Sequence, residues 1–173
     1  LKKISKLRDK HQWMTILVDS ILIILIFMLL SWYQNRGTLA ADGRQAPDFK
    51  LQNLKGDFVE LSSFKGKKVV LYFFASWCSI CELSSGNLNK LRASRDVDKL
   101  EILIVGLQWQ SAQEVINFAK KQKFTSPVLL GTPKQLQDYK IKGFPSYFII
   151  DEEGKVMHRS VGYSTEIGLR LRT

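Results

Sequence analysis

An apolar segment near the N-terminus constrains the fold of this chain most strongly. Residues 13–32 are almost wholly apolar and contain an unbroken apolar run from Ile21 to Leu30. As a helix, a segment of this length spans roughly 30 Å, which is about the hydrocarbon thickness of a bilayer. Trp13 and Trp32, at its two ends, suit the membrane–water interfaces. We therefore expect a single transmembrane helix over residues 13–32 and a separate folded domain after it.

The residues on either side of this segment predict its orientation. Lysine and arginine dominate residues 1–12, with Asp9 as the acidic exception, so the positive-inside rule predicts a cytoplasmic arm. The domain is then expected on the periplasmic side of a bacterial cytoplasmic membrane. A cleaved signal peptide is the alternative, with a weak cleavage site at residues 38–40, but the apolar run exceeds the usual length of about 7–15 residues. The polar and aperiodic residues 33–45 are predicted to form a linker.

Residues 46–173 are predicted to form one α/β domain. Alternating apolar residues in 49–53 and 58–61 indicate an N-terminal β-hairpin. The apolar runs 69–74, 100–107 and 128–130 are typical of buried strands. Helices are expected to begin near Cys78, where Leu83, Leu88 and Leu91 recur at helical spacing, and over 111–123, from 132, and in the tail from 164. Residues 146–151 and 155–161 predict an antiparallel pair of strands.

The two cysteines of the chain, Cys78 and Cys81, carry the clearest chemical signal. They belong to the sequence Trp-Cys-Ser-Ile-Cys, which follows a predicted buried strand and begins a predicted helix. Free N–H groups and the dipole at a helix N-terminus favour an anion, so we expect the pKa of Cys78 to lie below the ordinary thiol value of about 8.5. Cys78 is therefore predicted to be the nucleophile and Cys81, one turn deeper, the resolving thiol of a reversible disulfide.

Other uses of a cysteine pair are less compatible with this sequence. Free cysteines are often inert core residues. A zinc site needs about four ligands, and the chain offers only two histidines besides, of which His11 lies beyond the apolar segment from His158. No cofactor is expected apart from the redox-active disulfide itself.

Four stretches of the domain carry a resemblance to a known family. Residues 46–49 with 59–67 resemble the N-terminal part of redoxin-type proteins, and residues 73–81 resemble the active-site stretch of the TlpA-like branch. Residues 143–151 are similar to the cis-proline segment of that branch, and residues 162–170 to the ScsD-like group. The chain thus resembles TlpA-like, membrane-anchored thiol:disulfide oxidoreductases, closest to the ScsD, ResA and DsbE types.

This resemblance implies a thioredoxin fold with an N-terminal β-hairpin extension, a protein thiol or disulfide as client, and a membrane electron-transfer partner. It also implies a cis peptide bond before Pro145, so that an extended client segment pairs beside Cys78, with Trp77 and Phe144 supporting this groove. The chain departs from the family at two positions where a buried carboxylate is usual, which are Tyr72 and Ser84 here. The proton acceptor of Cys81 is therefore unassigned, with water or the Tyr72 hydroxyl as substitutes.

The direction of exchange is less constrained than the exchange itself. Neither Ser79 nor Ile80 is charged, so no cation between the cysteines lowers the pKa of Cys78 strongly. Together with the resemblance, this favours reduction of protein disulfides. A disulfide-forming oxidase or isomerase uses the same residues and stays open as an alternative.

Two further classes and one kind of partner fit the sequence poorly. A peroxiredoxin usually has a proline and a threonine where this chain has Leu71 and Ala75, and a copper chaperone of this fold has cysteines one residue further apart. The net charge is +10, but the lysine cluster at 120–123 has no interleaved aromatic residues and suits a solvated helix end. Nucleic acid is therefore not an expected partner.

Overall fold

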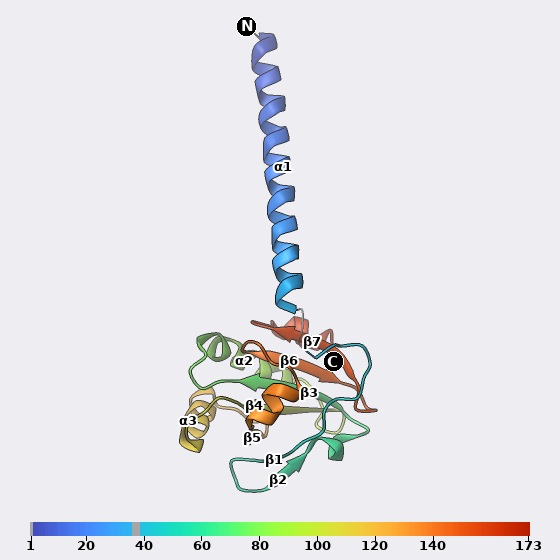
Figure 1. The fold of residues 1–173 in the computed structure, drawn as a ribbon, viewed down its shortest axis with the longest axis vertical. Coiled ribbons are helices and arrows are strands. Elements are labelled where there is room, and N and C mark those ends of the chain that lie inside the picture. Colours follow the sequence, from blue (N-terminus) through green and yellow to red (C-terminus); the bar gives the residue numbers. More distant parts are fainter. Residues whose placement is uncertain (1, 36–38) are drawn as a thin grey trace. The chain divides into compact units, whose positions relative to one another are not determined.

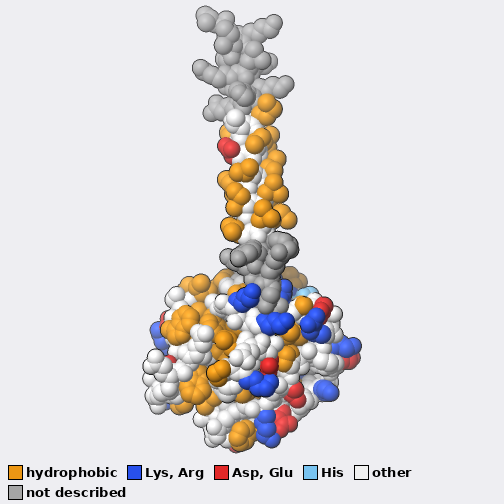
Figure 2. Space-filling model, viewed as in Figure 1, with side chains coloured by type: hydrophobic (Ala, Val, Ile, Leu, Met, Phe, Trp, Pro, Cys, Tyr) orange, Lys and Arg blue, Asp and Glu red, His pale blue; other side chains and the backbone are white. Residues whose placement is uncertain are grey.

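The computed structural model describes residues 2–35 and 39–173, and within the first range it describes the side chains of residues 13–30. These two ranges form separate compact units, helix α1 (Lys2–Asn35) and the domain that follows it (Figure 1). In α1, the segment Trp13–Leu30 has a mean hydropathy of 2.6, and none of its residues is buried. Hydrophobic side chains cover this segment (Figure 2). The helix is long and apolar enough to be a single membrane anchor, as the sequence predicts.

Five strands form the central sheet of the domain, in the order β5-β4-β3-β6-β7 (Figure 1). The strand β3 (Lys68–Phe74) pairs in parallel with β4 (Leu100–Gly106) and antiparallel with β6 (Ser146–Ile150). At the two edges, β5 (Val128–Leu130) pairs in parallel with β4, and β7 (Val156–Val161) pairs antiparallel with β6. The hairpin of β1 (Lys50–Gln52) and β2 (Phe58–Glu60) precedes this sheet and is followed by the 3₁₀ turn η1 (Leu61–Phe64).

Two hydrophobic cores cover the two faces of the sheet. On one face, alternate β3 residues such as Val70 and Phe74 pack with α2 (Ser79–Ala93), α3 (Ala112–Gln122) and α5 (Glu166–Arg170). On the other face, residues such as Leu71 and Phe73 pack with the hairpin and with the segment after α4 (Pro133–Asp138). Because side chains alternate along a strand, a central strand buried on both faces needs a continuous apolar run, and residues 69–74 supply it. The predicted α/β domain with an N-terminal β-hairpin is confirmed.

The predicted linker differs from the structure at both of its ends. Residues 33–35 continue α1, and the domain is already packed at Leu39, which is 5% exposed in the second core. The Leu39 N–H donates to the Tyr139 carbonyl at 3.2 Å, and its carbonyl accepts from Arg159 at 3.0 Å. The backbones of Gln45 and Lys155 pair in an isolated antiparallel β-bridge. One leucine in a polar stretch gives no periodicity, so the sequence pattern does not reveal this contact.

A leucine-to-alanine pair tests whether residues 39–45 belong to the domain. Leu39→Ala should lower the free energy of unfolding by about 2–4 kcal/mol, because it removes a buried side chain and leaves a cavity. Leu171→Ala is the matched control, since Leu171 is 83% exposed, and its effect should stay within about 0.5 kcal/mol. Urea unfolding of the full chain in detergent measures both. Equal effects of the two substitutions would contradict the assignment of Leu39 to the core.

Candidate active site

The two cysteines lie where β3 leads into α2. They form a disulfide with their Cα atoms 5.2 Å apart. Cys78 is the N-cap residue of α2, with an extended backbone conformation, and its Sγ accepts a hydrogen bond from the Cys81 N–H at 3.1 Å. A free N–H of the first helical turn therefore points at the Cys78 sulfur, where it stabilises a thiolate.

The two cysteines differ in exposure. Cys78 retains 7% of its surface exposed, whereas Cys81 is completely buried. Of the two, Cys78 is therefore the residue that offers surface to another protein. This asymmetry is what a nucleophilic and a resolving thiol require.

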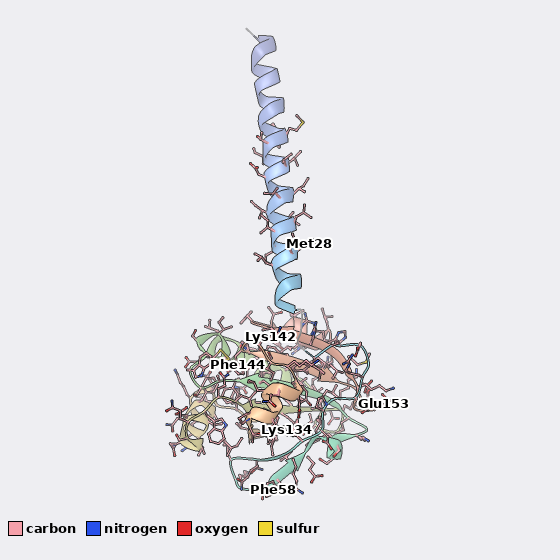
Figure 3. All side chains as sticks on the ribbon, in the orientation of Figure 1. Met28, Phe58, Lys134, Lys142, Phe144 and Glu153 are labelled. Carbon is pink, nitrogen blue, oxygen red and sulfur yellow. A yellow bond between two sulfur atoms is a disulfide. The ribbon has the colours of Figure 1, made fainter. Side chains whose placement is uncertain are left out.

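An aromatic pair and a cis-proline segment lie beside Cys78. The Trp77 ring is 66% exposed and contacts Phe144 edge to face, with 5.8 Å between the ring centroids. Figure 3 marks Phe144 in the loop before β6. The Phe144–Pro145 peptide bond is cis, which is what the family resemblance implies. Ser146 pairs with Phe73, so Pro145 lies level with the end of β3 that leads to Cys78. The structure therefore brings Trp77, Phe144 and Pro145 near the end of β3 that leads to Cys78.

Hydroxyl groups surround Cys81 on its buried side. The Tyr72 hydroxyl donates to the Cys81 carbonyl at 3.1 Å, and Ser85 Oγ donates to the same oxygen at 2.6 Å. Ser84 Oγ lies 3.5 Å from the Tyr72 hydroxyl and donates to the Ile80 carbonyl at 2.8 Å. The ring of Tyr147, on β6, lies 4.9 Å from that of Tyr72. We call Tyr72, Ser84, Ser85 and Tyr147 the hydroxyl cluster.

Burial controls the acidity of these tyrosines. It raises the pKa of Tyr72 to about 12, although the hydroxyls of Ser84 and Ser85 lower it in part. Burial likewise raises the pKa of Tyr147. The cluster is therefore uncharged at neutral pH and offers Cys81 hydrogen bonds without a permanent charge.

The nearby carboxylates are engaged elsewhere. Glu82, next to Cys81 in sequence, pairs with Lys121 on α3 at 2.8 Å. Glu114 accepts from Ser76 Oγ at 3.1 Å and thereby links α3 to the loop before Cys78. His158 is exposed on β7. Within the described part of the chain, no group of three histidine, cysteine or acidic side chains is arranged to hold a metal ion.

The sequence analysis identified one side of this site better than the other. The residues around Cys78, together with Tyr72, lie together in the structure. Ser85 and Tyr147 were missed, although their spacing was available: Ser85 follows Cys81 by one helical turn, and Tyr147 follows Pro145 by two residues on a strand. Leu83, which was counted with the apolar positions of the helix, is exposed instead.

Comparison with known proteins agrees with this geometry. The model of the AhpC/TSA family matches residues 43–159. The thioredoxin-like protein YneN of Bacillus subtilis is 32% identical over 153 residues, which cover 84% of this chain and 89% of YneN. The thiol-disulfide oxidoreductase ResA of the same organism is 34% identical over 127 residues, which cover 73% of this chain and 70% of ResA.

A solved structure shows the same fold. The protein from Chlorobium tepidum that is described as thiol:disulfide interchange protein DsbE superposes with a TM-score of 0.69 and 30% sequence identity. The match covers 75% of this chain and 93% of that protein. The thioredoxin fold that the resemblance implies is confirmed.

The raised pKa of Tyr72 predicts a loss of stability in alkali. In the unfolded chain Tyr72 loses its proton near pH 10, whereas in the folded domain it keeps the proton up to about pH 12. The folded state is therefore fully stable with respect to this group below about pH 10, and it loses stability as the pH rises from there toward about 12. Between about pH 9 and pH 11, Tyr72→Phe should therefore lose about 1 kcal/mol less stability than the unsubstituted protein. Urea unfolding of the oxidised protein at both pH values measures this difference. Equal losses would show that Tyr72 ionises as readily in the folded chain as in the unfolded one.

Proposed function

Because the chain belongs to the AhpC/TSA family and is a thiol-disulfide oxidoreductase, we propose that Cys78 and Cys81 reduce disulfides of a client protein on the periplasmic side of a bacterial cytoplasmic membrane. The observation that carries this proposal is the disulfide at the start of α2, with Cys78 accessible and Cys81 buried. Disulfide exchange needs one thiolate that meets the client and a second thiol that completes the reaction.

The exchange has two steps. The Cys78 thiolate attacks one sulfur of the client disulfide, forms a mixed disulfide and releases the other client sulfur as a thiolate that takes up a proton. Cys81 then loses its proton and attacks the Cys78 sulfur, so that the Cys78–Cys81 disulfide forms and the second client thiol leaves reduced. The client gains two electrons, which the two cysteines give up, and two protons; because Cys78 reacts as a thiolate, one proton balances the one that Cys81 loses and the other comes from water.

The groove beside Cys78 suits an extended client segment. Trp77 offers an exposed aromatic face, and Phe144 and Pro145 lie at the end of the central strands. A client backbone in this groove holds its cysteine next to the Cys78 sulfur. On the buried side of the site, the Tyr72 hydroxyl donates a hydrogen bond to the Cys81 carbonyl.

The anchor supports the proposed location and the proposed source of electrons. The apolar segment of α1 has the length of a bilayer span, and the basic residues before it favour a cytoplasmic N-terminus. Each turnover leaves an oxidised pair, which must regain two electrons before the next client. A membrane electron-transfer partner that accepts this disulfide as its own substrate supplies them.

Serine substitutions separate the roles of the two cysteines. Cys81→Ser should accumulate a mixed disulfide with a client, because the second step is blocked, whereas Cys78→Ser should accumulate none. The yield is measured by alkylation and non-reducing electrophoresis of the full chain in detergent, with a disulfide-containing model protein as client. Trapping through Cys81 in the Cys78→Ser variant at the same rate would reverse the assignment.

The reduction potential decides the direction of exchange. A value near or below about −250 mV against a graded dithiol buffer is expected for a reductase, because such a pair donates electrons to ordinary protein disulfides. A value of about −120 to −180 mV would instead identify an oxidase or isomerase with the same residues.

A further inference from the structure

Three of the four hydroxyl groups in the hydroxyl cluster donate hydrogen bonds, and the fourth does not. Tyr72 and Ser85 donate to the Cys81 carbonyl, and Ser84 donates to the Ile80 carbonyl. The Tyr147 hydroxyl is buried and has no hydrogen-bond partner within 3.5 Å, and it is the one such side-chain atom among the described residues. A buried hydroxyl without a partner destabilises a folded protein, so its retention calls for a state in which a partner exists.

Tyr147 lies in the same hydrophobic core as Cys81. Tyr147 pairs directly with Tyr72 on the neighbouring strand, and both side chains lie on the sheet face that α2 covers. The Tyr72 hydroxyl reaches the Cys81 carbonyl. The hydroxyl of Ser84, one turn after Cys81, lies 3.5 Å from that of Tyr72 and is near enough to Tyr147 to lower the pKa of that tyrosine in part.

Cys81 needs a donor only while the disulfide is open. In the oxidised protein its sulfur is bonded to Cys78 and carries no charge. To attack a mixed disulfide it must become a thiolate, and complete burial opposes that charge. Among the described side chains, no aspartate, glutamate or histidine is buried to take the proton or to stabilise the ion. A hydrogen-bond donor is the remaining means of stabilising it.

We propose that the Tyr147 hydroxyl, the spare donor of the cluster, donates a hydrogen bond to the Cys81 sulfur as that sulfur attacks the mixed disulfide on Cys78. In this step the Cys81 S–H proton passes to water, the Cys81–Cys78 bond forms, and the bond from Cys78 to the client sulfur breaks. The client sulfur departs as a thiolate and takes up a proton. The inference rests on the proposed function and adds the group that promotes its second step.

The charged side chains on the surrounding elements lie at the surface and form ion pairs there. Glu82 on α2 pairs with Lys121 on α3, and Glu166 pairs with Arg170 on α5 at 2.6 Å. Tyr163, before α5, is exposed and accepts a hydrogen bond from Asn87. Besides the cysteines, the titratable groups that face the interior here are Tyr72 and Tyr147, from β3 and β6. The pH dependence of the second step therefore reports on Cys81 and these two hydroxyls.

The second step can be timed with a chromogenic probe. Reduced full-length protein in detergent is mixed with dithiobis(nitrobenzoate), which forms a mixed disulfide on Cys78, and the release of the second coloured thiolate follows the attack by Cys81. In Tyr147→Phe this release should be about tenfold slower near neutral pH, because a hydrogen bond to the forming thiolate is lost. The pH at which the rate reaches half its maximum should rise by about one unit. Rates are recorded from about pH 6 to pH 9.

Tyr139→Phe is the matched control. Tyr139 is equally buried, but its hydroxyl donates to the Pro47 carbonyl in the other core, at 2.7 Å. This variant should keep the rate and pH profile of the unsubstituted protein. Tyr147→Phe should also be at least as resistant to urea in its oxidised form, because it removes an unpaired buried group, so a slow second step cannot be attributed to unfolding.

The outcomes separate this inference from the proposed function. If the unsubstituted protein releases both coloured thiolates and Tyr147→Phe does so at the same rate and pH midpoint, the Tyr147 hydroxyl has no part in the second step. If the unsubstituted protein releases only the first, Cys81 does not resolve the mixed disulfide and the proposed function fails together with the inference.

Discussion

The pairing of β3 with strands on both sides is the constraint on which the rest of the domain depends. Its parallel register with β4 and antiparallel register with β6 bury every residue from Val69 to Phe74. From the C-terminal end of this strand the chain continues through residues 75–77 to Cys78 and α2. The same pairing brings the start of β6, with its cis-proline, level with the cysteines. Backbone hydrogen bonds therefore hold the cysteine segment next to the cis-proline segment, independently of the side chains in either.

The sequence predicts those parts of the structure that depend on residues close together in the chain, and it predicts contacts between distant residues less well. Strands buried on both faces are visible as apolar runs, and the helix N-terminus at Cys78 follows from what comes before and after it. Contacts made by single residues are not visible in this way. Leu39 packs against a segment about a hundred positions further along the chain, and no local pattern announces it. The second turn of α2 directs Ser84 and Ser85, not Leu83, toward the core, because the two serines follow the buried Cys81 by about one helical turn.

The same distinction separates the two thiols. The environment of Cys78 is built from the backbone of a helix start, which any sequence with this fold provides. The environment of Cys81 is built from side chains on β3, β6 and α2, so it depends on the amino-acid sequence and not only on the fold. Exchange chemistry as such is thus a property of the fold. The conditions under which the second step proceeds are set by residues such as Tyr72 and Tyr147.

The hydrogen bonds to the Cys81 carbonyl also divide the site into a fixed and a free part. Tyr72 ties that carbonyl to the central strand, and Ser85 ties it to the next turn of α2. Cys78 is held only by its own loop and the first turn of the helix, next to the exposed Trp77 ring. When the two sulfurs part, the displacement is therefore expected to fall on Cys78 and Trp77. Trp77 then moves with the reacting sulfur, while Phe144 and Pro145, next to the paired strand β6, and the buried thiol stay in place.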